Sequence, residues 1–165
     1  MKRLFILLLI STFSSVFAQS PTNFNGTYTI NKSKTDFRTD AGQAPDWVLP
    51  VKFKVTQSGN NVTIVRTIVD DRGVQSDRTY IFAGDTPSDI TTAKGSKIHT
   101  TLQWNADKTA FTLDTKIADI DPQSSENFTE VWSLNNDSKL LVLDRNEEQL
   151  GNGLKYHIKG YYEKN

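Results

Sequence analysis

The chain contains no cysteine, and this absence excludes several kinds of chemistry at once. Without thiols the protein cannot form disulfides, build a thiolate metal site, use a cysteine nucleophile or take part in thiol exchange. The fold must therefore be stabilised by its hydrophobic core alone, which a domain of ordinary size can supply. Small secreted eukaryotic domains are often rich in disulfides, so for an exported protein the absence also favours a bacterial source.

An excess of charge is also lacking, because 19 Lys and Arg residues balance 19 Asp and Glu residues. Loss of the first 18 residues would remove Lys2 and Arg3 and leave 17 basic residues against 19 acidic ones. A chain this close to neutral has no basic field that could attract nucleic acid or an anionic membrane surface. We therefore expect no nucleic-acid partner.

Histidine is scarce, and alternation places both copies, His99 and His157, on the outward faces of predicted strands. Neither histidine belongs to a zinc-ligand spacing, and the acidic segment 119–126 lacks the glycine and the ligand spacing of a calcium loop. The sequence also has no Gly-x-Ser-x-Gly elbow, no glycine-rich phosphate loop and no carboxylates that can be paired across one cleft. We expect no metal, no cofactor and no catalytic residues, and therefore no enzyme.

Long apolar runs are absent except at the start of the chain. Lys2 and Arg3 precede the unbroken apolar run Leu4–Ile10, and Val16–Ala18 supplies the small residues that signal peptidase requires. The run is short for a permanent membrane span, although an uncleaved anchor remains an alternative. The pattern predicts a signal peptide over residues 1–18 and one mature domain over residues 19–165. We expect a secreted or periplasmic location and no stable membrane insertion after cleavage.

Helical periodicity is nearly absent from the mature chain, which alternates apolar and polar residues in short runs between polar turns. Val51, Phe53 and Val55 share one face of such a run. The turn Ser58–Asn61 follows, where Gly and Asn accept the positive φ angles of a hairpin. Strands of this kind are predicted over residues 27–30, 51–57, 62–70, 78–82, 97–104, 110–117, 126–134, 140–145 and 154–163.

These runs predict about nine strands joined mostly by short hairpins, with one buried face and one solvated face. A long antiparallel meander leaves open edges, and closing the sheet on itself removes them. The sequence therefore predicts an all-β fold, a single antiparallel up-and-down meander barrel of about 8–10 strands. The one long connection, residues 31–50, is expected to cover an end of the barrel.

Several motifs, in the order in which they occur, resemble those of bacterial secreted lipocalin-like (calycin-type) domains. They are Asn25–Asn31 with Lys32, Ser33 and Phe37, then Gln57–Ile64, Trp104–Lys108, and Glu130–Leu134 with Lys139–Leu143. Tyr28 stands where that family usually has Trp, and the turn glycines expected after Asp107 and Asp137 are missing. The resemblance implies an eight- to ten-stranded barrel, often with an internal apolar cavity, and no agreed activity.

Two charged residues are predicted to point into the barrel. Glu130 shares a strand face with Phe128 and Trp132, and Arg66 shares one with Ile64. A buried carboxylate is costly unless it is paired or hydrogen-bonded. One hypothesis is that Glu130 and Arg66 pair beside a cavity and hold a polar ligand group. The alternatives are a structural ion pair at a barrel end, or a bulge that turns one of the two outward.

The inward aromatic residues either line a ligand cavity or fill the barrel as its core. The candidate ligand-binding residues are Phe53, Arg66, Trp104, Phe111, Phe128, Glu130, Trp132 and Tyr156. The leading interpretation is a secreted or periplasmic lipocalin-like protein that binds a small apolar or amphipathic ligand in the barrel. The alternative is a non-enzymatic interaction or inhibitor module, a filled barrel that contacts an envelope or extracellular protein through Trp47, Val48 and Leu49.

Overall fold

The computed structural model of the chain describes residues 20–39, 42–43, 48–70, 72–135 and 137–165. The predicted signal peptide, residues 1–18, lies outside these residues and stays a prediction. Within the described ranges, no helix is long and apolar enough to cross a membrane.

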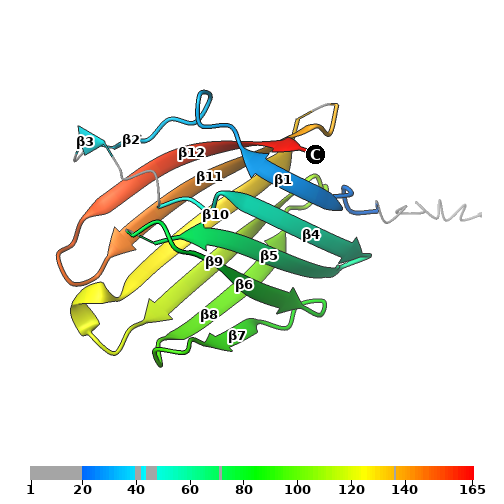
Figure 1. The fold of residues 1–165 in the computed structure, drawn as a ribbon. Helices are drawn as coiled ribbons and strands as arrows, with labels where there is room; N and C mark the ends of the chain where they lie inside the picture. Colours follow the sequence, from blue (N-terminus) through cyan, green and yellow to red (C-terminus); the bar gives the residue numbers. More distant parts are fainter. Residues whose placement is uncertain (1–19, 40–41, 44–47, 71, 136) are drawn as a thin grey trace, which may run out of the picture.

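Ten antiparallel strands form one strongly curved sheet, in which strands that follow each other along the chain pair, except β6 and β7 at its two edges (Figure 1). In chain order, the strands of this sheet are β1 (Gly26–Ile30), β4 (Lys52–Ser58), β5 (Asn61–Val69), β6 (Gln75–Phe82), β7 (Ser88–Thr91), β8 (Lys97–Trp104), β9 (Ala110–Ala118), β10 (Glu126–Leu134), β11 (Leu140–Gln149) and β12 (Lys155–Lys164). The last strand, β12, pairs with β1, so the sheet wraps round on itself.

The barrel is nearly closed, with its one break in the ladder between β6 and β7. At that break the backbone amide of Ile81 donates to the hydroxyl of Ser88 over 3.1 Å, in place of a strand pairing. The predicted all-β, single up-and-down meander barrel is thus confirmed, and its ten strands fall within the predicted number.

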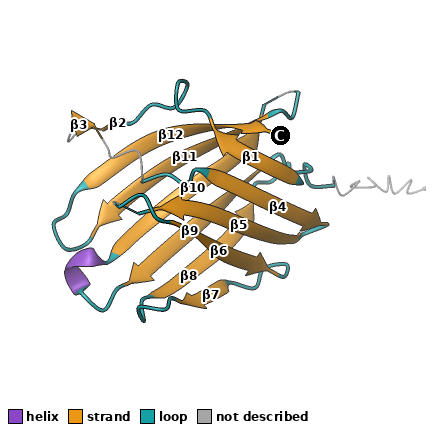
Figure 2. Cartoon of the chain, viewed as in Figure 1, coloured by secondary structure: helices purple, strands orange, loops and turns teal. Residues whose placement is uncertain are grey.

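The described residues also form three short elements: β2 (Arg38–Thr39), β3 (Gly42–Gln43) and the 3-10 turn η1 (Pro122–Ser124), drawn in purple in Figure 2. The connection over residues 31–50 ends inside the molecule, because Leu49 is fully buried and belongs to the core. The assignment of Leu49 to an exposed docking surface was therefore wrong. Trp47 of that predicted surface lies outside the described residues, and Val48 is half-buried.

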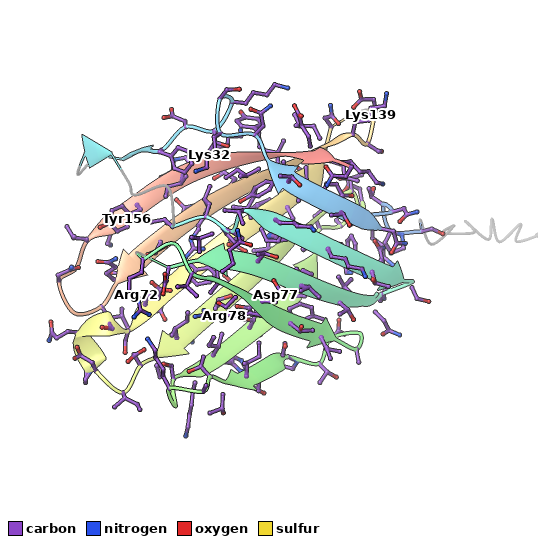
Figure 3. All side chains as sticks on the ribbon, viewed as in Figure 1. Lys32, Arg72, Asp77, Arg78, Lys139 and Tyr156 are labelled. Atoms are coloured by element: carbon purple, nitrogen blue, oxygen red, sulfur yellow. The ribbon has the colours of Figure 1, made fainter. Side chains whose placement is uncertain are left out.

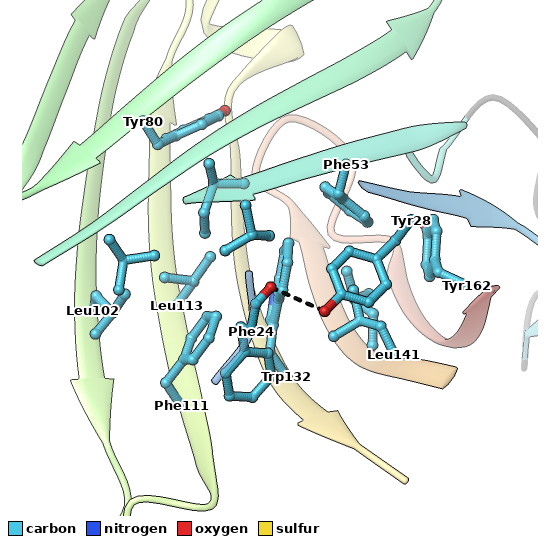
Figure 4. Close-up of a cluster of buried hydrophobic side chains, with 14 of the residues drawn as sticks. Phe24, Tyr28, Phe53, Tyr80, Leu102, Phe111, Leu113, Trp132, Leu141 and Tyr162 are labelled. Atoms are coloured by element: carbon cyan, nitrogen blue, oxygen red, sulfur yellow. Dashed lines mark hydrogen bonds between the residues drawn. The ribbon is translucent and has the colours of Figure 1, made fainter. Parts of the chain in front are cut away.

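One half of the barrel interior is packed with aromatic rings (Figure 4). Phe24, just before β1, plugs this end, and its carbonyl accepts a 2.9 Å hydrogen bond from the hydroxyl of Tyr28. The ring of Phe24 contacts that of Phe111 with centroids 4.8 Å apart, and Phe53 contacts Trp132 at 4.5 Å. These edge-on contacts fill the space, so this half of the barrel is a core.

Two turns adopt the left-handed backbone conformation that glycine favours, although neither has a glycine at that position. Lys108 and Ser138, the residues after Asp107 and Asp137, both have φ of 56°. Residues other than glycine adopt this left-handed conformation at a cost. The turn geometry suggested by the resemblance is therefore present at both sites, although the glycines are not.

Candidate functional site

Arg66 and Glu130 meet inside the barrel from opposite walls, since β5 and β10 lie five strands apart in the sheet order. The guanidinium of Arg66 donates end-on to the carboxylate of Glu130, from Nη1 to Oε1 over 2.9 Å and from Nη2 to Oε2 over 2.6 Å. Glu130 is 0% exposed and Arg66 is 2% exposed. The predicted inward pair is confirmed, and the alternative of a bulge that turns one residue outward was wrong.

The pair belongs to a larger network that includes residues of β11. Arg145 donates from Nη1 to Oε1 of Glu130 over 3.2 Å, and Trp132 donates from Nε1 to Oε2 of Glu130 over 3.2 Å. Arg145 also binds Oε2 of Glu147, through Nε at 2.9 Å and Nη2 at 2.6 Å. Burial opposes the charge on Glu130, but the guanidinium groups of Arg66 and Arg145 hold its pKa below the usual value.

Sequence reasoning missed Arg145 as an inward residue and missed Glu147 altogether. The predicted strand ended at Arg145, whereas β11 continues to Gln149. The signal was present in the alternation, because Leu141 and Leu143 share the face of Arg145 and Glu147. The residues of β11 after Leu143 are all polar, so the strand has no apolar alternation there. Its sequence therefore resembles that of a loop.

The network ends in a pair of acids, Glu147 and the partly buried Glu126. Burial, and then the negative charge of Glu147, raise the pKa of Glu126 to about 7. Arg145 and, from the facing strand β6, Arg78 act in the opposite direction. Two neighbouring carboxyl groups titrate together, and Glu147 favours the protonated form of Glu126.

We expect the protein to lose stability as pH rises from about 5 to about 8. Because the pKa of Glu126 rises from 4.5 to about 7 in the fold, the native state binds more protons than the unfolded chain between these values. Ionising Glu126 in the fold should therefore lower the free energy of unfolding, on the order of 1–3 kcal/mol. Urea denaturation at pH 5 and pH 8 measures the difference, and Glu126→Gln should abolish it. A gain in stability over this interval would contradict the account.

Aromatic rings enclose the arginines of the network. The guanidinium carbon of Arg66 lies 4.7 Å from the ring centroid of Tyr80 and 5.6 Å from that of Trp132. Arg145 lies 3.8 Å from the ring centroid of Phe128. These cation–π contacts partly replace the hydration that both arginines lose on burial.

The eight candidate residues separate into two groups. Phe53, Phe111 and Trp132 are fully buried in the aromatic half, and partly buried Trp104 packs beside Phe24 and Phe111. Phe128 lies against Arg145 in the charged half, and half-buried Tyr156 is the register partner of Glu147. The structure therefore places the aromatic core and the charged residues in adjoining halves of the interior, and Trp132 contacts both.

Solvent reaches the charged end of the barrel. Several side chains that alternation turns inward there are only partly buried, among them Ile68, Arg78, Ile117, Glu126 and Tyr156. Arg78 on β6 and Tyr156 on β12 are labelled in Figure 3. A ligand entering the barrel at this end would meet these side chains before the packed aromatic half.

A groove of about 680 Å³ crosses the outer face of strands β8 to β12, and a second hollow of about 450 Å³ adjoins it. Most of the side chains that line the groove are polar and face outward, including His99 and His157. Each histidine lies 2.7 Å from an aspartate, Asp89 and Asp144 respectively. The groove also reaches side chains that face the barrel interior, because Thr115, Phe128, Glu147 and Tyr156 are among its lining residues. In the described ranges no group of three His, Cys, Asp or Glu residues could hold a metal ion.

No protein family and no curated protein matches the chain. Eight chains of solved structures match it. One is zebrafish ileal bile acid-binding protein complexed with cholic acid, at 14% sequence identity and a TM-score of 0.49. The match covers 86% of this chain and 98% of the zebrafish chain. The barrel itself is established by the strand order of this chain.

Proposed function

We propose that this chain is a secreted or periplasmic protein that binds a small apolar or amphipathic molecule in the barrel interior. The apolar part of the ligand would enter toward the aromatic half, and its polar part would stay at the charged end. The protein would carry its ligand without chemistry, and so without metal or cofactor. Export would follow from the predicted signal peptide, and residues 19–165 would form the one functional domain.

The observation that carries the proposal is the charge network turned into the barrel. A set of buried ion pairs adds little stability compared with apolar residues of the same volume, so stability alone does not account for it. The network is also incomplete, because Nε of Arg66 is buried and has no acceptor among the described residues. A polar ligand group would supply such an acceptor.

A second candidate function is an interaction module, favoured by the filled aromatic half and by the polar groove across β8 to β12. Such a protein would use its outer face and would need no ligand inside. The two candidates differ in whether the charged end of the barrel takes up a small molecule.

Titration with the neutral fluorescent probe N-phenyl-1-naphthylamine tests the proposal. Ile117 faces inward at the charged end, and the neighbouring Lys116 faces outward on the same strand. We expect saturable binding of the probe to the wild-type protein. In Ile117→Trp the affinity for the probe should fall by about tenfold or more, because the indole would occupy the charged end of the barrel. Lys116→Trp adds the same ring outside and should leave the affinity unchanged. Absence of saturable binding, or equal effects of both variants, would favour the interaction module.

A further inference from the structure

Two arginines lie side by side on the inner wall at the charged end. Arg66 on β5 and Arg78 on β6 are direct register partners, and alternation turns both into the barrel. Like charges directly opposite each other on neighbouring strands repel. Glu130 neutralises Arg66 from the facing wall. Within the described ranges Arg78 makes no side-chain hydrogen bond or ion pair of its own, and it is half-buried.

The free donors of Arg66 face away from its ion pair. Its two terminal nitrogens are engaged end-on by Glu130, which leaves the edge of the guanidinium that carries Nε. Nε is buried and has no acceptor within the described part of the chain. A buried N–H without an acceptor is rare in native proteins and calls for a partner such as a ligand or an ordered water.

The balance of charge inside the barrel also favours an anion. The six interior groups are Arg66, Arg78, Arg145, Glu126, Glu130 and Glu147. Burial and Glu147 favour the protonated form of Glu126, and in that state the six groups carry one net positive charge. Glu130 and Glu147 are engaged by Arg66 and Arg145, so the uncompensated charge lies on Arg78.

We propose that the ligand carries an anionic oxygen acid, a carboxylate or a sulfonate, which lies between Arg66 and Arg78. One oxygen would accept from Nε of Arg66 and another from the guanidinium of Arg78, a two-point contact that suits planar or forked anions. This inference rests on the proposed function, because it names the polar group of the same ligand.

Three probes with the same ten-carbon chain test the charge of the ligand: decanoate, decan-1-ol and decylammonium. Each is measured by displacement of N-phenyl-1-naphthylamine. We expect decanoate to bind the wild-type protein most tightly of the three. Arg78→Met should lower the affinity for decanoate by about tenfold or more and should change the affinity for decan-1-ol little. Lys54→Met is the matched control, since Lys54 is an exposed, outward-facing cation on β4 and its loss changes the net charge equally.

The possible outcomes separate the two proposals. If decan-1-ol or decylammonium binds as well as decanoate, or if Arg78→Met and Lys54→Met behave alike, the anion site is wrong while the binding function stands. If N-phenyl-1-naphthylamine does not bind the wild-type protein, the binding function itself fails.

A measurement on the wild-type protein addresses Arg66 without a destabilising substitution. The Nε–Hε resonance of Arg66 can be followed by ¹H–¹⁵N NMR during titration with decanoate and with decan-1-ol. A new hydrogen bond to an anion should shift this resonance with decanoate only. An unchanged Arg66 resonance at saturating decanoate would overturn the proposed contact and leave water as the acceptor.

Discussion

Replacement of Glu130 by Gln should lower the free energy of unfolding by about 3–5 kcal/mol, because it leaves two buried cations without their shared carboxylate. Among the described residues, Arg66 would then have no ion-pair partner, and Arg145 would retain only Glu147. Gln fills the same volume, so the loss would come from charge rather than from packing. Urea denaturation monitored by tryptophan fluorescence measures the effect.

Glu163→Gln is the matched control for this variant. Glu163 also accepts from a cation, Lys34, at 3.1 Å, but both side chains are more than half exposed. Solvent screens such a pair, and its loss should cost less than about 1 kcal/mol. Equal effects of the two substitutions would show that the interior network does not behave as a buried one.

A double substitution separates stability from function. Glu130→Leu combined with Arg66→Met replaces the ion pair by apolar side chains and leaves the contact between Arg145 and Glu147 intact. Such replacements are often neutral or stabilising, so most of the stability lost in Glu130→Gln should return. If the network serves binding, this stable variant should nevertheless bind decanoate much more weakly than the wild-type protein.

Replacement of Trp132 by Ala should also cost about 3–5 kcal/mol, the range for a large core aromatic residue. Trp132 is 0% exposed, and its ring centroid lies 4.5 Å from that of Phe53 and 5.4 Å from that of Phe111. Its loss would leave a cavity among these rings and would remove a donor to Glu130. Thermal unfolding monitored by circular dichroism measures the change.

The neighbouring residue provides the control for Trp132. Val131 lies on the same strand, points outward and is 40% exposed. Val131→Ala should change stability by less than about 0.5 kcal/mol, as is usual for surface positions. A small effect of Trp132→Ala would mean that the aromatic half is loosely packed, contrary to the structure.

Much of the barrel could be predicted from alternation alone, because a side-chain period of two fixes which residues face inward once a strand is recognised. This is why the inward positions of Glu130 and Arg66 were predictable. Their contact could not be read from a pattern in the same way, since it joins residues 64 positions apart through the closure of the whole sheet. The pairing was therefore a hypothesis that only the fold could test.

The parts of the fold that were not predicted from the sequence also have physical explanations. The strand β7, Ser88–Thr91, has four residues, too few for an alternation to stand out from a turn. The charged continuation of β11 was not predicted for a different reason. Arg145 and Glu147 can both be buried because they form an ion pair with each other. Charges that are stable inside a barrel only as a network leave no apolar signal in the sequence.

Native mass spectrometry of the protein purified from its own host tests the central claim most directly. The account predicts a mature chain that lacks its first 18 residues and carries one small molecule, which solvent extraction would release as an acid. A mass that corresponds to the bare chain alone, under conditions gentle enough to preserve non-covalent complexes, would contradict the account and redirect attention to a protein partner.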